Sequence, residues 1–140
     1  MDDTEHYRDA VTNDDVFVSA WEYMQRKAHT NAINKGWWEK RDKAVEVLNA
    51  AGLGAYGKQL VMSQAILLEH CELSEGVEGM RKDLKDDKCP EFDMVVVEHA
   101  DVIIRMLDLA EKNQWPLAEA IIAKMKMNEG RPHMHGGKAF

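Results

Sequence analysis

Cysteine and clustered positive charge are scarce in this chain of 140 residues, and each absence excludes a class of protein. The two cysteines, Cys71 and Cys89, have neither the spacing of a metal motif nor a secretory context, so we expect reduced thiols. The net charge of −7 argues against a general nucleic-acid binder, which would carry a basic stripe. No hydrophobic run approaches membrane-spanning length, and the N-terminal MDDTEHYRD is unlike a signal peptide. We therefore expect a cytoplasmic protein that binds neither nucleic acid nor membranes.

The sequence also lacks the alternation of apolar and polar residues that is typical of β-strands, and it contains no internal repeat. Turn residues instead divide it into helical segments. Asn13, Asp14 and Asp15 are candidate N-caps for the first helix, and glycines follow the first and second helices. The expected helices cover about residues 16–33, 37–51, 56–84, 92–113 and 116–127. We predict one all-α domain over residues 1–140, a four- to five-helix bundle, with 130–140 as a flexible C-terminal arm.

Two acidic pairs inside long apolar runs are the most informative positive feature. Glu72 and Glu75 lie in AILLEHCELSEGVEG, and Glu98 and Asp101 lie in MVVVEHADVIIRML. Residues three apart are neighbours on one face of a helix. Because a buried carboxylate is costly unless it is paired or coordinates a metal, the two pairs predict a bound hard divalent cation. Mg²⁺ is the expected ion, with Mn²⁺ as the alternative.

Other glutamates near the first pair complicate this interpretation. Acidic residues recur every three positions from Glu69 to Glu78, and this run drifts round the helix, so its members cannot all share one site. We expect Glu78 to be exposed and Glu69 to be either an additional ligand or a surface group. Either acidic pair taken alone would favour a structural role, but the two together favour a metal site.

Both acidic helices are apolar over much of their circumference, which is typical of helices buried between neighbours. On the second helix, Glu98, Asp101, Arg105 and Asp108 lie on one narrow strip between apolar residues. On the first, one apolar stripe consists of Met62, Ile66, Leu73, Val77, Met80 and Leu84. We therefore expect the acids to lie in an interior or an interface.

Three motifs together resemble one known family. E-x-x-E followed by E-x-x-D on consecutive helices, the string ADVIIRMLDLA, and the tail KMKMNEGRPHMHGGKAF are similar to the MazG-like all-α nucleoside triphosphate pyrophosphohydrolases. This family includes the dCTP pyrophosphatases and small, single-domain members that phages often encode. The tail resembles the closing signature K-M-x-x-N-x-x-R-P followed by H-G-G-K. The resemblance covers about residues 60–140 well and the first 60 only loosely.

The resemblance implies a reaction and an assembly. The family cleaves a nucleoside triphosphate between the α and β phosphates, with Mg²⁺ required, and yields a monophosphate and pyrophosphate. Its members are dimers, or tetramers made of two dimers, with the catalytic pocket beside the subunit interface. By position, the metal-binding acids are Glu72, Glu75, Glu98 and Asp101, and the triphosphate-binding residues are Lys124, Asn128 and Arg131.

The remaining roles are less tightly specified. Glu75 is the first candidate for the general base, with Glu72 as the alternative. In the family the base-binding residues come from the N-terminal part. Adjacent aromatic residues there could stack on a base, but two neighbours in a helix point about 100° apart and cannot both do so. The further substrate-binding candidates are Trp37, Trp38, His29 and Arg105, with Asn31 and Lys35 expected in the same pocket wall.

Two other classes of helical protein make different demands on the same residues. A di-iron carboxylate bundle would need Glu-x-x-His, and no glutamate in this chain is followed by histidine three residues later. A non-catalytic helical module that binds nucleotide or only oligomerises would explain the apolar helices and the nine methionines. It would not explain why buried acids occur together with a Lys–Asn–Arg tail.

Overall fold

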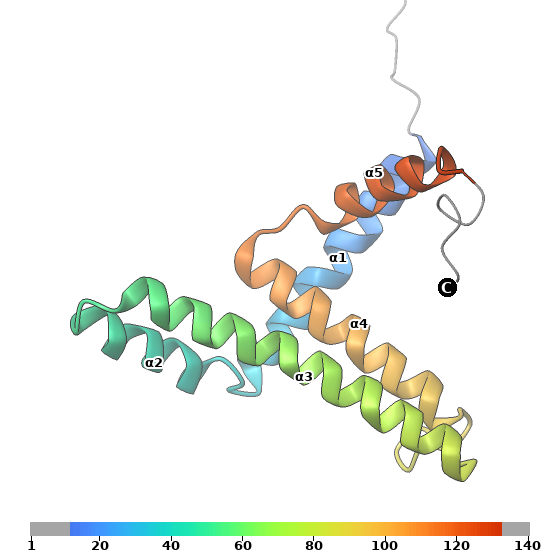
Figure 1. Ribbon diagram of the computed structural model, residues 1–140, viewed down its shortest axis with the longest axis horizontal. Helices are drawn as coiled ribbons and strands as arrows, with labels where there is room; N and C mark the ends of the chain where they lie inside the picture. The colour runs from blue at the N-terminus through green and yellow to red at the C-terminus, as the bar shows by residue number, and fades with distance from the viewer. Residues whose placement is uncertain (1–11, 133–140) are drawn as a thin grey trace, which may run out of the picture. The chain divides into compact units, whose positions relative to one another are not determined.

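The computed structural model describes residues 12–132, and this part of the chain is built from helices. The helices are α1 (Asn13–Asn34), α2 (Glu39–Ala50), α3 (Gly54–Lys82), α4 (Met94–Asn113) and α5 (Leu117–Glu129) (Figure 1). Between residues 12 and 132 there is no β-strand, only one isolated bridge between Lys85 and Asp93. The all-α prediction is confirmed, and each expected helix has a counterpart. The predicted arm falls mainly on 133–140, outside the described residues.

Contacts divide the chain into two compact units. The larger one, Met24–Trp115, contains the end of α1 together with α2, α3 and α4, and it includes all four predicted metal-binding acids. The other contains the chain up to Tyr23 and the chain from Pro116 onward, including α5. Within it, Phe17 and Trp21 pack with ring centroids 5.4 Å apart, and the ammonium of Lys126 lies 3.2 Å from a carboxylate oxygen of Asp14.

The first helix is capped one residue earlier than the sequence suggested. The backbone N–H of Asp15 donates to the Thr12 hydroxyl at 3.1 Å, and the N–H of Thr12 donates to the Asp15 carboxylate at 2.9 Å. This reciprocal arrangement is a capping box. Thr12 is therefore the N-cap, and Asp15 contributes from the first turn of the helix. The glycine turns were predicted correctly, since Gly36 and Gly52 adopt φ values of 74° and 77° after α1 and α2.

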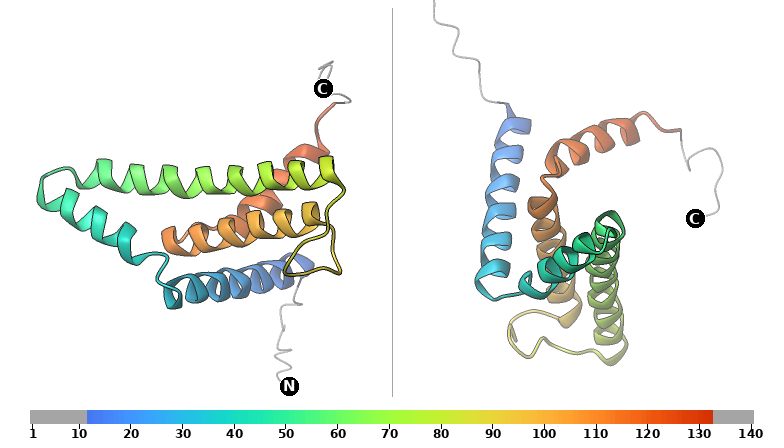
Figure 2. Two further views of the ribbon diagram at one scale, coloured as in Figure 1. Left: turned by 90° about the horizontal axis from the view of Figure 1, so that it is seen from below. Right: turned by 90° about the vertical axis from the view of Figure 1, so that its left-hand side faces the viewer.

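Within the larger unit, α3 and α4 lie side by side and run antiparallel, and α2 packs along the first half of α3 (Figures 1 and 2). The hydrophobic core of this unit is small. Its buried members are Ala32, Trp38, Ala65 and Leu109, with Val61 packed against them. Two alanines in this core pack against the larger side chains of Trp38 and Leu109.

Two glycines set the register between α3 and α4. A Cβ atom on Gly79 would lie 2.8 Å from the Cβ of Met94, and one on Gly76 would lie 3.4 Å from the Cβ of Glu98. Gly76, Gly79 and Glu72 share one face of α3, because they are spaced by three and four residues. The same face that lets the helices meet therefore carries Glu72 against α4.

The predicted apolar stripe of α3 is not buried in the single chain. Val77 and Met80 are 57% and 66% exposed, and Leu73 and Leu84 on the same face are also exposed. The expectation that this stripe packs between neighbours is thus not met within one chain. Among the helices of residues 12–132, none combines the length and the apolar character needed to cross a membrane.

A matched pair of substitutions tests the glycine register. Gly79→Ala is expected to lower the free energy of unfolding by about 1 kcal/mol. Overpacking against Met94 costs about 1–3 kcal/mol, and the better helix propensity of alanine offsets about 0.5–1 kcal/mol of this. Gly76→Ala, which meets only ordinary contact distances, should be neutral or slightly stabilising. Urea denaturation measures both, and a Gly79→Ala protein as stable as Gly76→Ala would refute the register.

Candidate functional site

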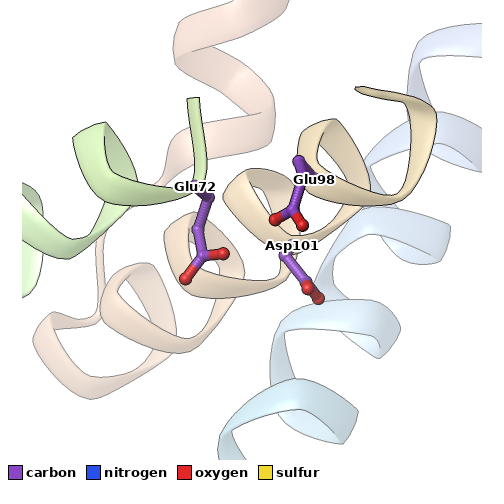
Figure 3. A group of neighbouring side chains, drawn as sticks. All are labelled: Glu72, Glu98 and Asp101. Atoms are coloured by element: carbon purple, nitrogen blue, oxygen red, sulfur yellow. The ribbon is translucent and has the colours of Figure 1, made fainter. Parts of the chain in front are cut away.

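Three of the four predicted metal-binding acids converge between α3 and α4. Glu72 extends from α3, and Glu98 and Asp101 extend from successive turns of α4 toward the same point (Figure 3). Each offers one carboxylate oxygen such that all three oxygens lie within 4.8 Å of one another. Glu72 and Glu98 are 8% and 6% exposed, while Asp101 remains partly accessible. The sequence therefore brings acids from two helices together at a site that is closed on one side and open on the other.

The donor set suits a small hard cation. Octahedral coordination at about 2.1 Å places ligand oxygens about 3 to 4 Å apart, which modest side-chain rotations could reach from the observed spacing. All three donors are carboxylate oxygens, and neither histidine nor cysteine belongs to the cluster in the described residues. The residues present thus fit Mg²⁺ or Mn²⁺.

One cation of the protein already contacts this cluster. Arg105, one turn beyond Asp101, donates from Nε to Glu72 Oε1 at 2.7 Å, and its Nη2 donates to the same oxygen. Arg105 was predicted to bind substrate, and that role remains a prediction. Its side chain is 38% exposed and also lines a neighbouring cavity, so it can touch both Glu72 and a molecule bound there.

The crowding of acids raises two pKa values in the cluster. Burial, a hydrogen bond with Glu72 and the negative charges of Glu75, Glu72 and Asp101 raise the pKa of Glu98 to about 7. Burial and the charge of Glu72 also raise the pKa of Asp101, although Arg105 opposes the effect. The ligand-free site thus carries more negative charge than its surroundings stabilise, and Glu98 holds a proton until the pH approaches neutrality.

The fourth predicted acid has a different position. Glu75 is exposed and is not one of the three converging carboxylates, although its charge acts on Glu98. Glu69 also lies outside the three, and burial raises its pKa. Glu78 forms ion pairs with Arg81 and Lys82, as expected for a surface residue.

The loop between α3 and α4 contributes charges that sequence analysis missed. Asp86 is buried, and its Oδ1 accepts the backbone N–H groups of Lys88 at 2.9 Å and Cys89 at 2.6 Å. The charges of Asp86 and Lys88 act on the pKa of Asp101 in opposite directions. The sequence did contain a signal for this role of Asp86, because aspartate side chains in turns commonly accept hydrogen bonds from backbone N–H groups two residues further along the chain.

A cavity of about 200 Å³ adjoins the cluster. Asp101 and Arg105 of α4 line it, and so do Trp37 and Asn31. Trp37 is 65% exposed, whereas Trp38 is 4% exposed and belongs to the core. The two tryptophans therefore differ in their surroundings, and Trp37 is the one that lines the cavity together with Asp101. Lys35 and His29, also predicted near the base, are not among the residues that line this cavity.

The predicted triphosphate-binding residues belong to the other compact unit. Lys124 and Asn128 are exposed on α5, and Arg131 follows the helix in the segment after Gly130. Their contact with a substrate held by the acids stays a prediction.

No protein-family model matches the chain, and neither a curated protein nor a solved structure matches it significantly. The resemblance to the MazG-like family therefore stays a prediction made from the motifs and their spacing.

The raised pKa of Glu98 leads to a test by pH. A cation needs the deprotonated carboxylate, so Mn²⁺ or Mg²⁺ affinity should increase as the pH rises to about 7, by up to about tenfold per pH unit. Calorimetric titration at about pH 6 and about pH 8 would measure it, with Glu98→Gln as the control that loses the step. Equal affinities at the two pH values would contradict the assignment.

The raised pKa of Glu98 also predicts that, without metal, the folded protein becomes less stable as the pH rises. The pKa of Glu98 is above its ordinary value of 4.5 in the folded protein, so the folded state binds more protons between these two values. Its contribution to stability is therefore present below about pH 4.5 and is lost as the pH rises to about 7.

Proposed function

We propose that this protein is a cytoplasmic, Mg²⁺-dependent nucleoside triphosphate pyrophosphohydrolase that cleaves between the α and β phosphates. The observation that carries the proposal is the convergence of Glu72, Glu98 and Asp101 from two adjacent helices, two of them buried. Buried carboxylates of like charge are unfavourable unless a cation or a proton compensates them. The motif resemblance then relates such a site to phosphate chemistry.

The proposed reaction assigns two roles to the four acids. Glu72, Glu98 and Asp101 would hold Mg²⁺, which when bound neutralises phosphate charge and orients the phosphate oxygens. Glu75, exposed and outside the three, is free to accept a proton from the attacking water. The water oxygen forms a bond to phosphorus as the bridging P–O bond breaks, and the pyrophosphate or monophosphate leaves. Arg105, with Lys124, Asn128 and Arg131 from the tail, would bind the negatively charged phosphates.

The cavity beside the acids supports nucleotide rather than inorganic phosphate as the substrate. An exposed indole and an amide, those of Trp37 and Asn31, line it together with Asp101 and Arg105. Aromatic rings stack on any nucleobase, and amides can hydrogen-bond to base edges. We therefore place the base against Trp37 and the phosphates toward the acids.

We also propose that the protein acts as a homodimer or a dimer of dimers. The support is the exposed apolar stripe of α3, whose residues Leu73, Val77, Met80 and Leu84 lie on one face. Contiguous apolar surface of this kind is typical of interaction sites. A non-catalytic oligomerisation module would use the same stripe but would not need the acids.

The reaction is tested by resolving products. Purified protein is incubated with each common ribo- and deoxyribonucleoside triphosphate, with Mg²⁺ and with chelator. Monophosphate with pyrophosphate is the expected outcome, only in the presence of Mg²⁺. Diphosphate with orthophosphate would overturn the α–β cleavage, and no turnover of any triphosphate would favour the non-catalytic module.

Glu98→Gln should abolish this turnover while leaving the helical content unchanged. The substitution removes one oxygen charge from the cluster, and we expect kcat/KM to fall by at least about a hundredfold. Glu78→Gln is the matched control, since Glu78 lies on α3 outside the three converging carboxylates and forms ion pairs with Arg81 and Lys82. A Glu98→Gln enzyme as active as Glu78→Gln would refute the metal role.

Self-association can be tested by introducing a charged residue into the exposed apolar stripe of α3. Val77→Glu should shift the protein toward monomer, because a charge is costly in an apolar interface. Light scattering after size exclusion gives the mass of each variant. Ala44→Glu, on an exposed position of α2, adds the same charge elsewhere and should leave the mass unchanged. A monomeric wild-type protein, or an unaffected Val77→Glu assembly, would count against this interface.

A further inference from the structure

Asp108 is a third carboxylate on the acidic strip of α4, but it binds tryptophan and histidine instead of joining the cluster. Its Oδ1 accepts the indole N–H of Trp38 at 2.9 Å, and Oδ2 lies 3.2 Å from the same nitrogen. Oδ1 also lies 2.6 Å from His29 Nδ1. The His29 ring and the Trp38 indole therefore meet at one carboxylate oxygen of Asp108. The side chains of His29 and Asp108 are each only 16% exposed, so these bonds are shielded from water.

These bonds tie α4 to two other parts of the same compact unit. His29 lies near the end of α1, and Trp38 lies in the turn that precedes α2. Cations also surround the Trp38 ring: Arg41 Cζ is 5.1 Å and Lys112 Nζ is 4.8 Å from its centroid. Trp38 is thus held at its edge and its face, and it cannot turn without breaking a hydrogen bond to a charged group.

The fixed position of Trp38 determines where its neighbour lies. Trp37 is covalently adjacent, and its backbone N–H donates to the carbonyl of Ala32 at 3.1 Å. Its exposed side chain lines the cavity beside the acids. Asp108 lines the same cavity as Trp37, Asp101 and Arg105. One carboxylate therefore connects the helix that bears the acids with the turn that bears the exposed aromatic ring.

We infer that Asp108 is a positioning residue. It holds the turn that bears Trp37 against α4, and it thereby determines how tightly the base of a nucleotide is bound. This inference rests on the proposed function, because it assumes that a nucleotide occupies the cavity. Asp108 does not contact the phosphates or the metal ligands in this role. It acts through Trp38 and His29.

A second carboxylate provides a matched control. Asp42 on α2 pairs with Lys112 on α4, with Nζ to carboxylate distances of 2.8 and 2.9 Å. It joins α4 to the neighbouring element much as Asp108 does. However, Asp42 lines a different cavity, together with Trp38, Lys58 and Met62, and not the one beside the acids. Loss of Asp42 thus removes a carboxylate between helices without touching the proposed base site.

The experiment uses the indole N–H resonances of the four tryptophans in ¹⁵N-labelled protein, assigned by single Trp→Phe variants. Each common nucleoside monophosphate is titrated as a probe that is not turned over. In the wild-type protein the Trp37 resonance should shift on binding. Asp108→Asn should move the Trp38 resonance before any ligand is added and raise the nucleotide concentration at the Trp37 midpoint by about tenfold. Asp108→Glu, which keeps the charged carboxylate, should recover part of the loss, and Asp42→Asn should leave the Trp37 midpoint at the wild-type value.

Each outcome decides a separate point. If the Trp38 resonance moves in Asp108→Asn while the Trp37 midpoint stays at the wild-type value, the positioning role is overturned and the proposed function survives. If no monophosphate shifts Trp37 in the wild-type protein, the nucleotide site itself fails and the inference fails with it. Should Asp108→Asn not fold, Trp38→Phe removes the indole N–H that donates to Asp108, together with part of the buried ring, and is expected to raise the midpoint by about threefold; an unchanged midpoint would again overturn the role.

Discussion

The close approach of α3 and α4 at Gly76 and Gly79 is the constraint on which the rest of the larger unit depends. A side chain at Gly79 would meet Met94 at 2.8 Å, so the present register requires that this face of α3 be bare. Glu72 lies on the same face, and the register brings its carboxylate to Asp101 and Arg105. The glycines cost helix stability, since each orders a flexible residue. At these two positions, glycine allows α3 to contact α4 but makes α3 less stable as an isolated helix.

That contact leaves the site with an imbalance of charge. Three carboxylates converge, the negative charge of Glu75 acts on Glu98, and Arg105 supplies one guanidinium, which is hydrogen-bonded to Glu72. A proton on Glu98 relieves part of the repulsion, which is why the pKa of Glu98 is raised to about 7. A divalent cation would relieve more of it. Proton and cation thus compete for the same oxygens, and the proton competes less as the pH rises past about 7.

Local sequence signals were sufficient for the helices but not for how the helices meet. The glycines after α1 and α2 correctly predicted where these helices end, whereas of the four acids in the apolar runs Glu72, Glu98 and Asp101 converge and Glu75 is exposed. The register of α3 on α4 could not be read in this way, because it depends on the space that Gly76 and Gly79 leave, and that space is a property of two helices. The α3 stripe was expected to be buried, yet Val77 and Met80 are exposed, because periodicity reveals an apolar face but not its partner.

The paired tryptophans show how one carboxylate can connect two functions of a site. Trp37 and Trp38 lie in the turn before α2, and only Trp37 is exposed and lines the cavity beside the acids. The structure gives the core to Trp38, whose indole needs a hydrogen-bond partner once it is buried, and Asp108 supplies that partner from α4. Because Asp108 lies on the same strip as Glu98 and Asp101, any movement of α4 relative to the turn is transmitted to both the acids and the exposed ring of Trp37. The positions of the acids and of the Trp37 ring are therefore coupled through Asp108.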